Sequence, residues 1–199
     1  MTLGSDLQQR IKGVVSSEEK VLEEASQDFG GIVSRRPAAV VRPSCNEDVI
    51  EVVRFANLHR LPLSLRGGGH SQSGQSLNQD GLIMDMRSLS RILVLDTARE
   101  NVLVEGGILW GELVDALLPQ ALVPPVLTNN LNVTVSGTLS VAGLGVASHR
   151  HGTQADHCEE LVVLTGTGEL VTCSPQQHAA LFNAARGGLG QFGVIVKAR

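Results

Sequence analysis

The stretch Leu63-Ser64-Leu65-Arg66-Gly67-Gly68-Gly69-His70-Ser71-Gln72-Ser73-Gly74-Gln75 decides how the chain is interpreted. Leucines alternate at positions 61, 63 and 65, which predicts a strand that ends at the glycines. Because glycine has no Cβ, three in succession allow positive φ angles and let backbone N–H groups come close to a bound group. Successive N–H groups of this kind form a concave anion site suited to a pyrophosphate. The polar residues that follow, His70, Ser71 and Gln75, lie beside that site.

A glycine-rich loop is most often only a surface turn. This loop, however, resembles the flavin-attachment loop of the FAD-linked oxidases that share the p-cresol methylhydroxylase and vanillyl-alcohol oxidase fold. In many members of that superfamily, the histidine of the pattern R-G-x-G-H-S is covalently bound to the 8α carbon of the isoalloxazine. The loop is not a Rossmann fingerprint, because no G-x-G-x-x-G opens a helix after this strand. Three interpretations of His70 remain open: a covalent flavin link, a non-covalent neighbour of FAD, or a turn residue.

The composition is that of an ordinary soluble globular protein, with 42% hydrophobic and 18% charged residues in 199. This length suits one domain or two intimately packed subdomains. A net charge of −4 without any Lys/Arg run argues against nucleic acid or an anionic membrane as partner. The cysteines Cys45, Cys158 and Cys173 form no C-x-x-C pair, which favours reduced thiols over disulfides or zinc. With neither a signal peptide nor a bilayer-length apolar stretch, the sequence predicts a cytoplasmic location.

The first half of the chain predicts a small α+β unit. An N-terminal helical arm, residues 1–30, holds one or two amphipathic helices between residues 5 and 29, with a capping-box spacing at Ser16–Glu19. A short strand within Arg36–Pro43 and a helix from Glu47 to about His59 precede the strand that leads to the glycine loop. Further strands are predicted at Leu82–Met86, Arg91–Asp96 and Val102–Glu105. We place this first unit at about residues 31–105.

A second α+β unit is predicted from about residue 106 to 199. A helix over Trp110–Leu118 precedes the second glycine-bearing stretch, Leu127–Gly145, whose small residues let another surface approach the backbone. A strand, a turn and a return strand follow within Leu161–Thr172, and a helix is expected from Ser174 to about Arg186. The chain stops directly after a predicted strand, Phe192–Val196, and we expect it to be truncated at the C-terminus.

Motifs in the second half make the resemblance more specific. The segments Thr134–Gly143, Arg150–Gly152, Leu164–Ser174 and Gly187–Ile195 resemble segments of cytokinin dehydrogenases in their order and approximate spacing. Together with Arg66–Gln75, the resemblance covers about residues 30–199. Several separated motifs in one order are stronger support than any single pattern. The chain therefore resembles the PCMH-type FAD-binding domain, and cytokinin dehydrogenase most closely.

The resemblance implies an α+β fold in which two subdomains hold FAD between them, with the substrate cap domain absent. His70 would be the point of covalent attachment. The other residues of the first subdomain that would contact the phosphates and ribityl chain of FAD are Arg66, Gly67, Gly68, Gly69, Ser71 and Gln75. The residues of the second subdomain that would line the cofactor are Asn129, Thr134, Gly137, Ser140, Leu144 and Ile195. Family members oxidise an amine or alcohol carbon by hydride transfer to the flavin, which implies a small-molecule substrate.

Two departures from the family pattern matter. Cytokinin dehydrogenases carry an aspartate that accepts the amine hydrogen of the substrate, and the matching position here is Asn129. A neutral amide offers hydrogen bonds but cannot take a proton as a carboxylate can, so a catalytic role for Asn129 is open to question. Related enzymes with doubly attached flavin use a cysteine in the segment that matches Ala142–Val146, and none is present here. His70 is then the single available link.

Three functions remain to be compared. The first is the FAD domain of an oxidoreductase acting on a C–N or C–OH bond, completed by a missing cap domain or partner chain. The second is a stand-alone flavin-binding or flavin-carrying module without turnover, which Asn129 favours. The third is a non-binding remnant of the fold, against which the complete glycine loop argues. A metal site at His149–His151 is not expected, because tetrahedral zinc would need further ligands to converge there.

Overall fold

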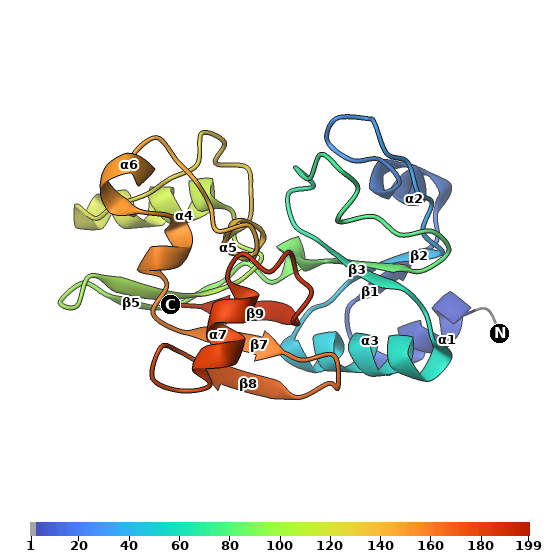
Figure 1. Ribbon diagram of the computed structural model, residues 1–199. Helices are drawn as coiled ribbons and strands as arrows, with labels where there is room; N and C mark the ends of the chain where they lie inside the picture. Colours follow the sequence, from blue (N-terminus) through green and yellow to red (C-terminus); the bar gives the residue numbers. More distant parts are fainter. Residues whose placement is uncertain (1–2) are drawn as a thin grey trace. The chain divides into compact units, whose positions relative to one another are not determined.

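Two β-sheets organise the chain, each within its own structural unit (Figure 1). The computed structural model describes residues 3–199. Unit 1 comprises Met1–Ser88 with Gly166–Glu169, and unit 2 comprises Leu89–Thr165 with Leu170–Arg199. The sequence placed the boundary near residue 105. It falls after Ser88 because β5 (Ile92–Asp96) and β6 (Asn101–Glu105) pair within the sheet of unit 2.

The sheet of unit 1 has the strand order β1-β2-β4-β3. Its strands are β1 (Val14–Ser16), β2 (Ala39–Arg42), β3 (Leu63–Arg66) and β4 (Leu82–Asp85). The last three run parallel, whereas β1 is antiparallel to β2. All four residues of β4 are buried, as expected for the central strand of a parallel arrangement. The carboxyl ends of three adjacent strands therefore lie at one edge of this sheet.

Helices cover both faces of the unit 1 sheet (Figure 1). Helices α1 (Leu3–Arg10) and α3 (Asn46–His59) lie on one face, and α2 (Glu19–Ala25) lies on the other. Helix α3 buries Val49, Val52, Val53 and Phe55, which recur at helical spacing. A short 3-10 helix, η1 (Met86–Ser88), follows β4.

The N-terminal arm differs from the prediction of helices up to residue 29. A strand, β1, separates α1 from α2, and α2 ends at Ala25. The expected capping box is absent, because Glu18 is the N-cap of α2 and its side chain makes no capping hydrogen bond. Phe29 therefore lies beyond the helix, where 59% of it is exposed.

The sheet of unit 2 is antiparallel throughout, with the order β5-β6-β9-β7-β8. Strands β7 (Leu161–Leu164) and β8 (Leu170–Cys173) form the predicted hairpin, and β9 (Val194–Ala198) lies between β6 and β7. Helix α4 (Trp110–Leu117) buries Trp110 and Leu113 in the core of this unit, where the Trp110 indole N–H donates to Thr138 Oγ1 at 2.8 Å.

The short helices of unit 2 show where local signals failed. Helices α5 (Val135–Leu139) and α6 (Ser148–His151) and the 3-10 helices η2 (Leu118–Gln120) and η3 (Gln154–His157) were not predicted. Ser174 does not cap a helix; its hydroxyl accepts from the backbone N–H groups of Gln176 and Gln177 in a turn. Helix α7 (Ala179–Ala185) begins only after His178, whose φ is 50°. No helix in residues 3–199 is long and apolar enough to cross a bilayer.

Candidate functional site

The glycine loop, Gly67–Gly69, follows β3 directly, and the backbone conformation of Gly69 sets its course. Gly69 has a φ of +73°, a conformation that residues with a Cβ rarely adopt. A Cβ there would lie 2.8 Å from Nη2 of Arg66, so the arginine side chain occupies the space that glycine leaves. Gly67 and Gly68 line a hollow of about 170 Å³ at the end of the sheet. The loop thus presents main chain rather than side chains to a ligand.

The segment after α2 fixes the histidine of this loop. The ring of Phe29 stacks on the ring of His70, with 4.6 Å between centroids and 27° between planes. The backbone N–H of Phe29 donates to the carbonyl of Ser71 at 2.9 Å. A Cβ on Gly74, whose φ is +71°, would lie 2.7 Å from Cγ1 of Val33. Stacking and close packing therefore hold the loop against residues 29–33, a contact that the sequence gave no signal for.

Arg66 joins the loop to the end of helix α2. Its guanidinium donates to the carbonyl oxygens of Glu24 (3.4 Å), Ala25 (3.4 Å) and Gln27 (3.2 Å). Burial, and then the nearby charge of Arg87, lower the pKa of Arg66, and Asp85 partly offsets this. Arg66 was predicted to contact a cofactor; the structure shows it bonded to backbone carbonyls beside the loop.

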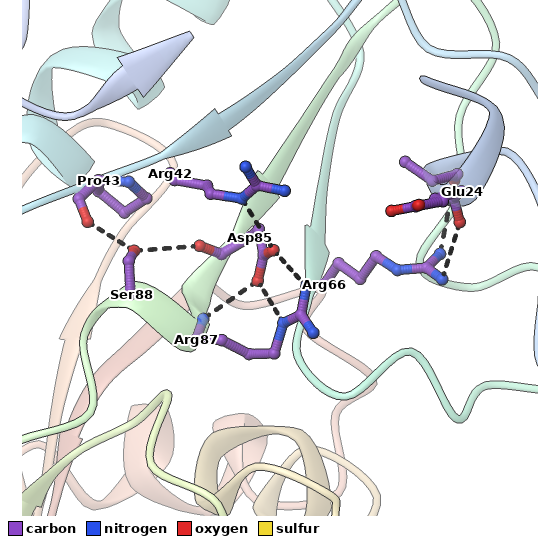
Figure 2. Close-up of polar contacts among 8 residues, drawn as sticks. Glu24, Arg42, Pro43, Arg66, Asp85, Arg87 and Ser88 are labelled. Atoms are coloured by element: carbon purple, nitrogen blue, oxygen red, sulfur yellow. Dashed lines mark hydrogen bonds and ion pairs between the residues drawn. The ribbon is translucent and has the colours of Figure 1, made fainter. Parts of the chain in front are cut away.

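Charged side chains gather where the parallel strands of unit 1 end (Figure 2). Asp85 is 4% exposed; its oxygens accept from Nε and Nη2 of Arg87 at 2.9 and 2.6 Å. Nε of Arg42 lies 3.5 Å from Oδ2 of the same carboxylate. Burial opposes ionisation of Asp85, but the hydrogen bonds and charge of Arg87, with the charge of Arg42, outweigh it and lower its pKa. Arg42 and Arg87 were not among the predicted site residues, because their convergence depends on strand register.

The predicted residues of unit 2 lie around helix α5 and differ in accessibility. Thr134 is buried and caps α5, its hydroxyl accepting from the N–H of Gly137 at 3.2 Å. Gly137 is exposed, and Ser140 is partly exposed with its hydroxyl donating to the Ser136 carbonyl at 2.8 Å. Ile195 is 3% exposed and belongs to the same buried cluster as Val135 and Leu139 of α5, so its side chain lies in the core. A Cβ on Gly106 would lie 2.5 Å from its carbonyl oxygen.

Exposed apolar side chains accompany α5 on the same unit. Leu144, a predicted lining residue, is 72% exposed, and Val141 and Val146 nearby are 55% and 77% exposed. Leu189, 54% exposed, lies close because its N–H donates to the Ser140 carbonyl at 2.8 Å. Single exposed apolar residues are normal, but three in one segment with Leu189 beside them suit contact with a flat apolar ligand.

Asn129 lies exposed in a turn of unit 2. The hydroxyl of Thr128 donates to the Asn130 carbonyl at 2.8 Å, and the Asn132 N–H donates to Oδ1 of Asn130 at 2.8 Å. The side chain that stabilises this turn is that of Asn130, next to Asn129. The side chain of Asn129 is a neutral amide, so residue 129 does not supply a proton acceptor.

Other features lie apart from the predicted residues. Unit 2 contains an apolar cavity of about 430 Å³ lined by Trp110, Leu113, Leu117 and their neighbours, none of which was predicted as a site residue. Within residues 3–199, no three His, Cys, Asp or Glu side chains group as they would around a metal ion. Burial raises the pKa of the Cys158 thiol to about 12, which makes this thiol unreactive at neutral pH.

Comparison with known proteins gives the family. A family model described as "FAD binding domain" matches residues 37–174. Cytokinin dehydrogenase 7 of Oryza sativa subsp. japonica is 45% identical over 181 residues, which are 88% of this chain and 34% of the relative. An uncharacterized oxidoreductase from a fasciation locus of Rhodococcoides fascians is 40% identical over 188 residues, 94% of this chain and 42% of the relative.

A solved structure shares the fold. 6-hydroxy-D-nicotine oxidase from Arthrobacter nicotinovorans superposes with a TM-score of 0.85 at 27% identity, covering 94% of this chain and 41% of that one. The predicted fold class, a PCMH-type FAD-binding fold, is thereby confirmed, as is the resemblance to cytokinin dehydrogenases. The chain spans less than half the length of these relatives.

The residues present fit FAD. In unit 1, Gly67 and Gly68 form part of a polar hollow, and the positive φ of Gly69 turns the loop where a side chain would be excluded. Backbone N–H groups and arginines are the donors that phosphates prefer. In unit 2, the exposed apolar side chains near α5 suit an aromatic ring system.

Proposed function

Because the chain belongs to the FAD-binding domain family, we propose that it is the cofactor-binding part of a flavin-dependent oxidoreductase resembling cytokinin dehydrogenase. When bound, FAD supplies a two-electron acceptor for hydride from a C–N or C–OH carbon of a small-molecule substrate. The observation that carries the proposal is the glycine loop of unit 1, in which His70 is held by stacking on Phe29.

Different residues of the chain would bind different parts of the cofactor. The backbone of Gly67–Gly69 and the polar groups of Ser71 and Gln75 bind the phosphates and ribityl chain. His70 would be the residue that holds the flavin covalently, and stacking on Phe29 already fixes its ring in one orientation. A ring that is held in place loses little rotational entropy when it forms a bond, which favours attachment. Residues Gly137, Ser140 and Leu144 line the cofactor from unit 2, with Thr134 shaping the backbone there and Ile195 contributing main chain.

Asn129 favours a second candidate, a flavin-binding module without turnover. The relatives' activity belongs to proteins more than twice as long, and a neutral amide at residue 129 cannot accept a proton from the substrate. If residue 129 has a catalytic role, it is therefore as a hydrogen-bonding group. Substrate oxidation then depends on groups outside this chain or on a substrate that loses its proton to water.

The proposal is tested by asking whether flavin stays with denatured protein. We expect wild-type protein precipitated with acid to carry a fluorescent flavin that remains with the polypeptide on a denaturing gel. His70→Ala should release its flavin into the supernatant, because no imidazole is left to form the bond. His149→Ala, an exposed histidine of unit 2, is the matched control and should retain the fluorescent band.

The outcomes separate the candidates. A fluorescent band in His70→Ala would refute His70 as the attachment point. Flavin released from wild type as well would leave FAD binding intact and make His70 a neighbour only. A third outcome is protein carrying flavin, attached or not, that none of a panel of amines and alcohols reduces. That outcome would favour the module without turnover.

A further inference from the structure

The carboxyl ends of three neighbouring strands bring charged residues together in unit 1. In the sheet order β2-β4-β3, Arg42 ends β2, Asp85 ends β4 and Arg66 ends β3. The register pairs Arg66 with Asp85 directly and Val41 with Met84, so Arg42 also lies beside Asp85. In parallel sheets this edge is the usual place for a ligand.

A hollow of about 170 Å³ opens at this edge. Its polar walls are Arg42, Arg66, Asp85, Arg87 and Glu24, with the backbone of Gly67 and Gly68 completing it. Three arginines and two acidic residues line it, which gives these residues together a formal charge of +1. The glycines add main-chain surface without side chains, so a small ligand can reach both guanidinium and backbone groups.

Arg42 and Arg87 share one partner, Asp85, whereas backbone carbonyls hold Arg66, as Figure 2 shows. Asp85 binds Arg87 through two hydrogen bonds and attracts Arg42 at 3.5 Å, and carbonyls at the end of α2 hold Arg66. The Asp85 side chain is only 5% exposed, whereas those of Arg42 and Arg87 are 43% and 50% exposed. A ligand that enters therefore meets the guanidinium groups of Arg42 and Arg87 before the Asp85 carboxylate, and the exposed Glu24 also lines the hollow.

We propose that this hollow is an oxyanion site that takes a phosphate group, with Arg42 and Arg87 as its principal donors. Guanidinium groups have a planar fork of N–H donors that matches phosphate oxygens, and prepositioned forks lose little entropy on binding. Neither arginine is needed to explain the glycine loop or His70. The phosphate can come from the dinucleotide, in which case the inference extends the proposed function, or from free phosphate in solution.

The test compares two arginines of equal exposure. Arg42→Gln removes one donor while Arg87 still pairs with Asp85, so the buried carboxylate stays compensated. Arg36→Gln is the control, because the Arg36 side chain is 44% exposed, lies in the same unit and pairs with Glu19 outside the hollow. Inorganic phosphate is titrated into the purified protein, with and without flavin, and followed by phosphorus NMR line width and by thermal shift. Loss of one charged hydrogen bond is expected to weaken phosphate binding about tenfold in Arg42→Gln, and Arg36→Gln should behave as wild type.

A second arm identifies the source of the phosphate. If the cofactor supplies it, Arg42→Gln weakens FAD binding about tenfold and leaves riboflavin, which lacks phosphate, unaffected. If the site takes free phosphate, inorganic phosphate binds equally well before and after flavin is loaded. Equal phosphate and FAD binding by Arg42→Gln, Arg36→Gln and wild type would overturn the inference and leave a structural ion-pair cluster. Wild-type protein that holds no flavin would defeat the proposed function, whereas the phosphate titration would still decide this inference.

Discussion

Asp85 in unit 1 and Glu105 in unit 2 are two buried carboxylates at strand ends, and they are used differently. Both are almost inaccessible, at 4% and 2% exposure, and each accepts two side-chain hydrogen bonds from one arginine. Glu105 also accepts from the backbone N–H of Arg91 at 2.9 Å, and its own N–H donates to the Arg91 carbonyl at 2.9 Å. Arg91, just before β5, and Glu105, at the end of β6, are thus joined through side chain and backbone together, and Lys197 of β9 adds a second positive charge near Glu105.

Asp85 is instead surrounded by more positive charge than it can balance. Arg42 and Arg66 approach it in addition to Arg87, and all three border a hollow next to the glycine loop. Glu105 therefore completes a contact within the sheet of unit 2, and Asp85 holds two arginines at the edge of the hollow. The difference lies in sharing: one arginine binds Glu105 through both side chain and backbone, whereas Asp85 is shared by arginines that are about half exposed at the hollow.

The largest loss of stability is expected when the Arg91–Glu105 pair is broken. Arg91→Met should lower the free energy of unfolding by about 2–3 kcal/mol, because it removes two charged hydrogen bonds from the buried Glu105 carboxylate. The backbone N–H of residue 91 and the charge of Lys197 remain, and the Arg91 side chain is 72% exposed, so the loss stays below that of a fully buried pair. Urea denaturation followed by circular dichroism measures the loss. Arg99→Met is the control: Arg99 is 81% exposed and 3.8 Å from Asp96, so its loss should cost under about 0.5 kcal/mol. Equal losses in the two variants would contradict the structural role of Glu105.

A smaller loss of stability is expected when Asp85 loses one of its two arginine partners, Arg42 and Arg87. Arg87→Met should cost about 1–2 kcal/mol, because Arg42 remains to compensate Asp85 and the backbone N–H of residue 87 still donates to it at 3.2 Å. Arg42→Met should lower the free energy of unfolding more in the Arg87→Met background than in the wild type, since Asp85 would then have lost both guanidinium groups. Urea denaturation of the single and double variants completes this cycle. Strictly additive losses would mean that the arginines do not share Asp85.

Local sequence signals predicted the elements on which the site is built. Alternating leucines placed β3 correctly to within a residue or two, and the glycines after it predicted the loop. The strand over Leu82–Asp85 and the helix that begins at Asn46 also follow from apolar periodicity and turn residues. These features depend on neighbours in the sequence, which is why a single chain reveals them.

Features that depend on distant residues were not predictable from the sequence. The strands β5 and β6 were assigned to the first unit because they follow β4 in sequence, yet β6 pairs with β9, about 90 residues later. Phe29 was placed on a helix, whereas it stacks on His70, 41 positions away. Likewise, Arg42 and Arg87 meet at Asp85 only because β2, β4 and β3 run parallel in one register. No pattern within either segment contains that information.

The smallest predicted effect is the response of Asp85 to acid. Because its pKa in the folded protein lies below that of the unfolded chain, its ionisation adds stability above about pH 4, the range of an ordinary aspartate, and loses it as pH falls through the lower folded value. Asp85→Asn has no ionisable group at this position, so its stability lacks this dependence on pH. The wild type should therefore be more stable than Asp85→Asn by about 1 kcal/mol near pH 6, and the difference should shrink below pH ~4. Free energies of unfolding measured in urea from about pH 6 to below about pH 4 test this. A constant difference across the range would mean that Asp85 acts through packing and hydrogen bonds, and that its charge does not hold the arginines of the cluster.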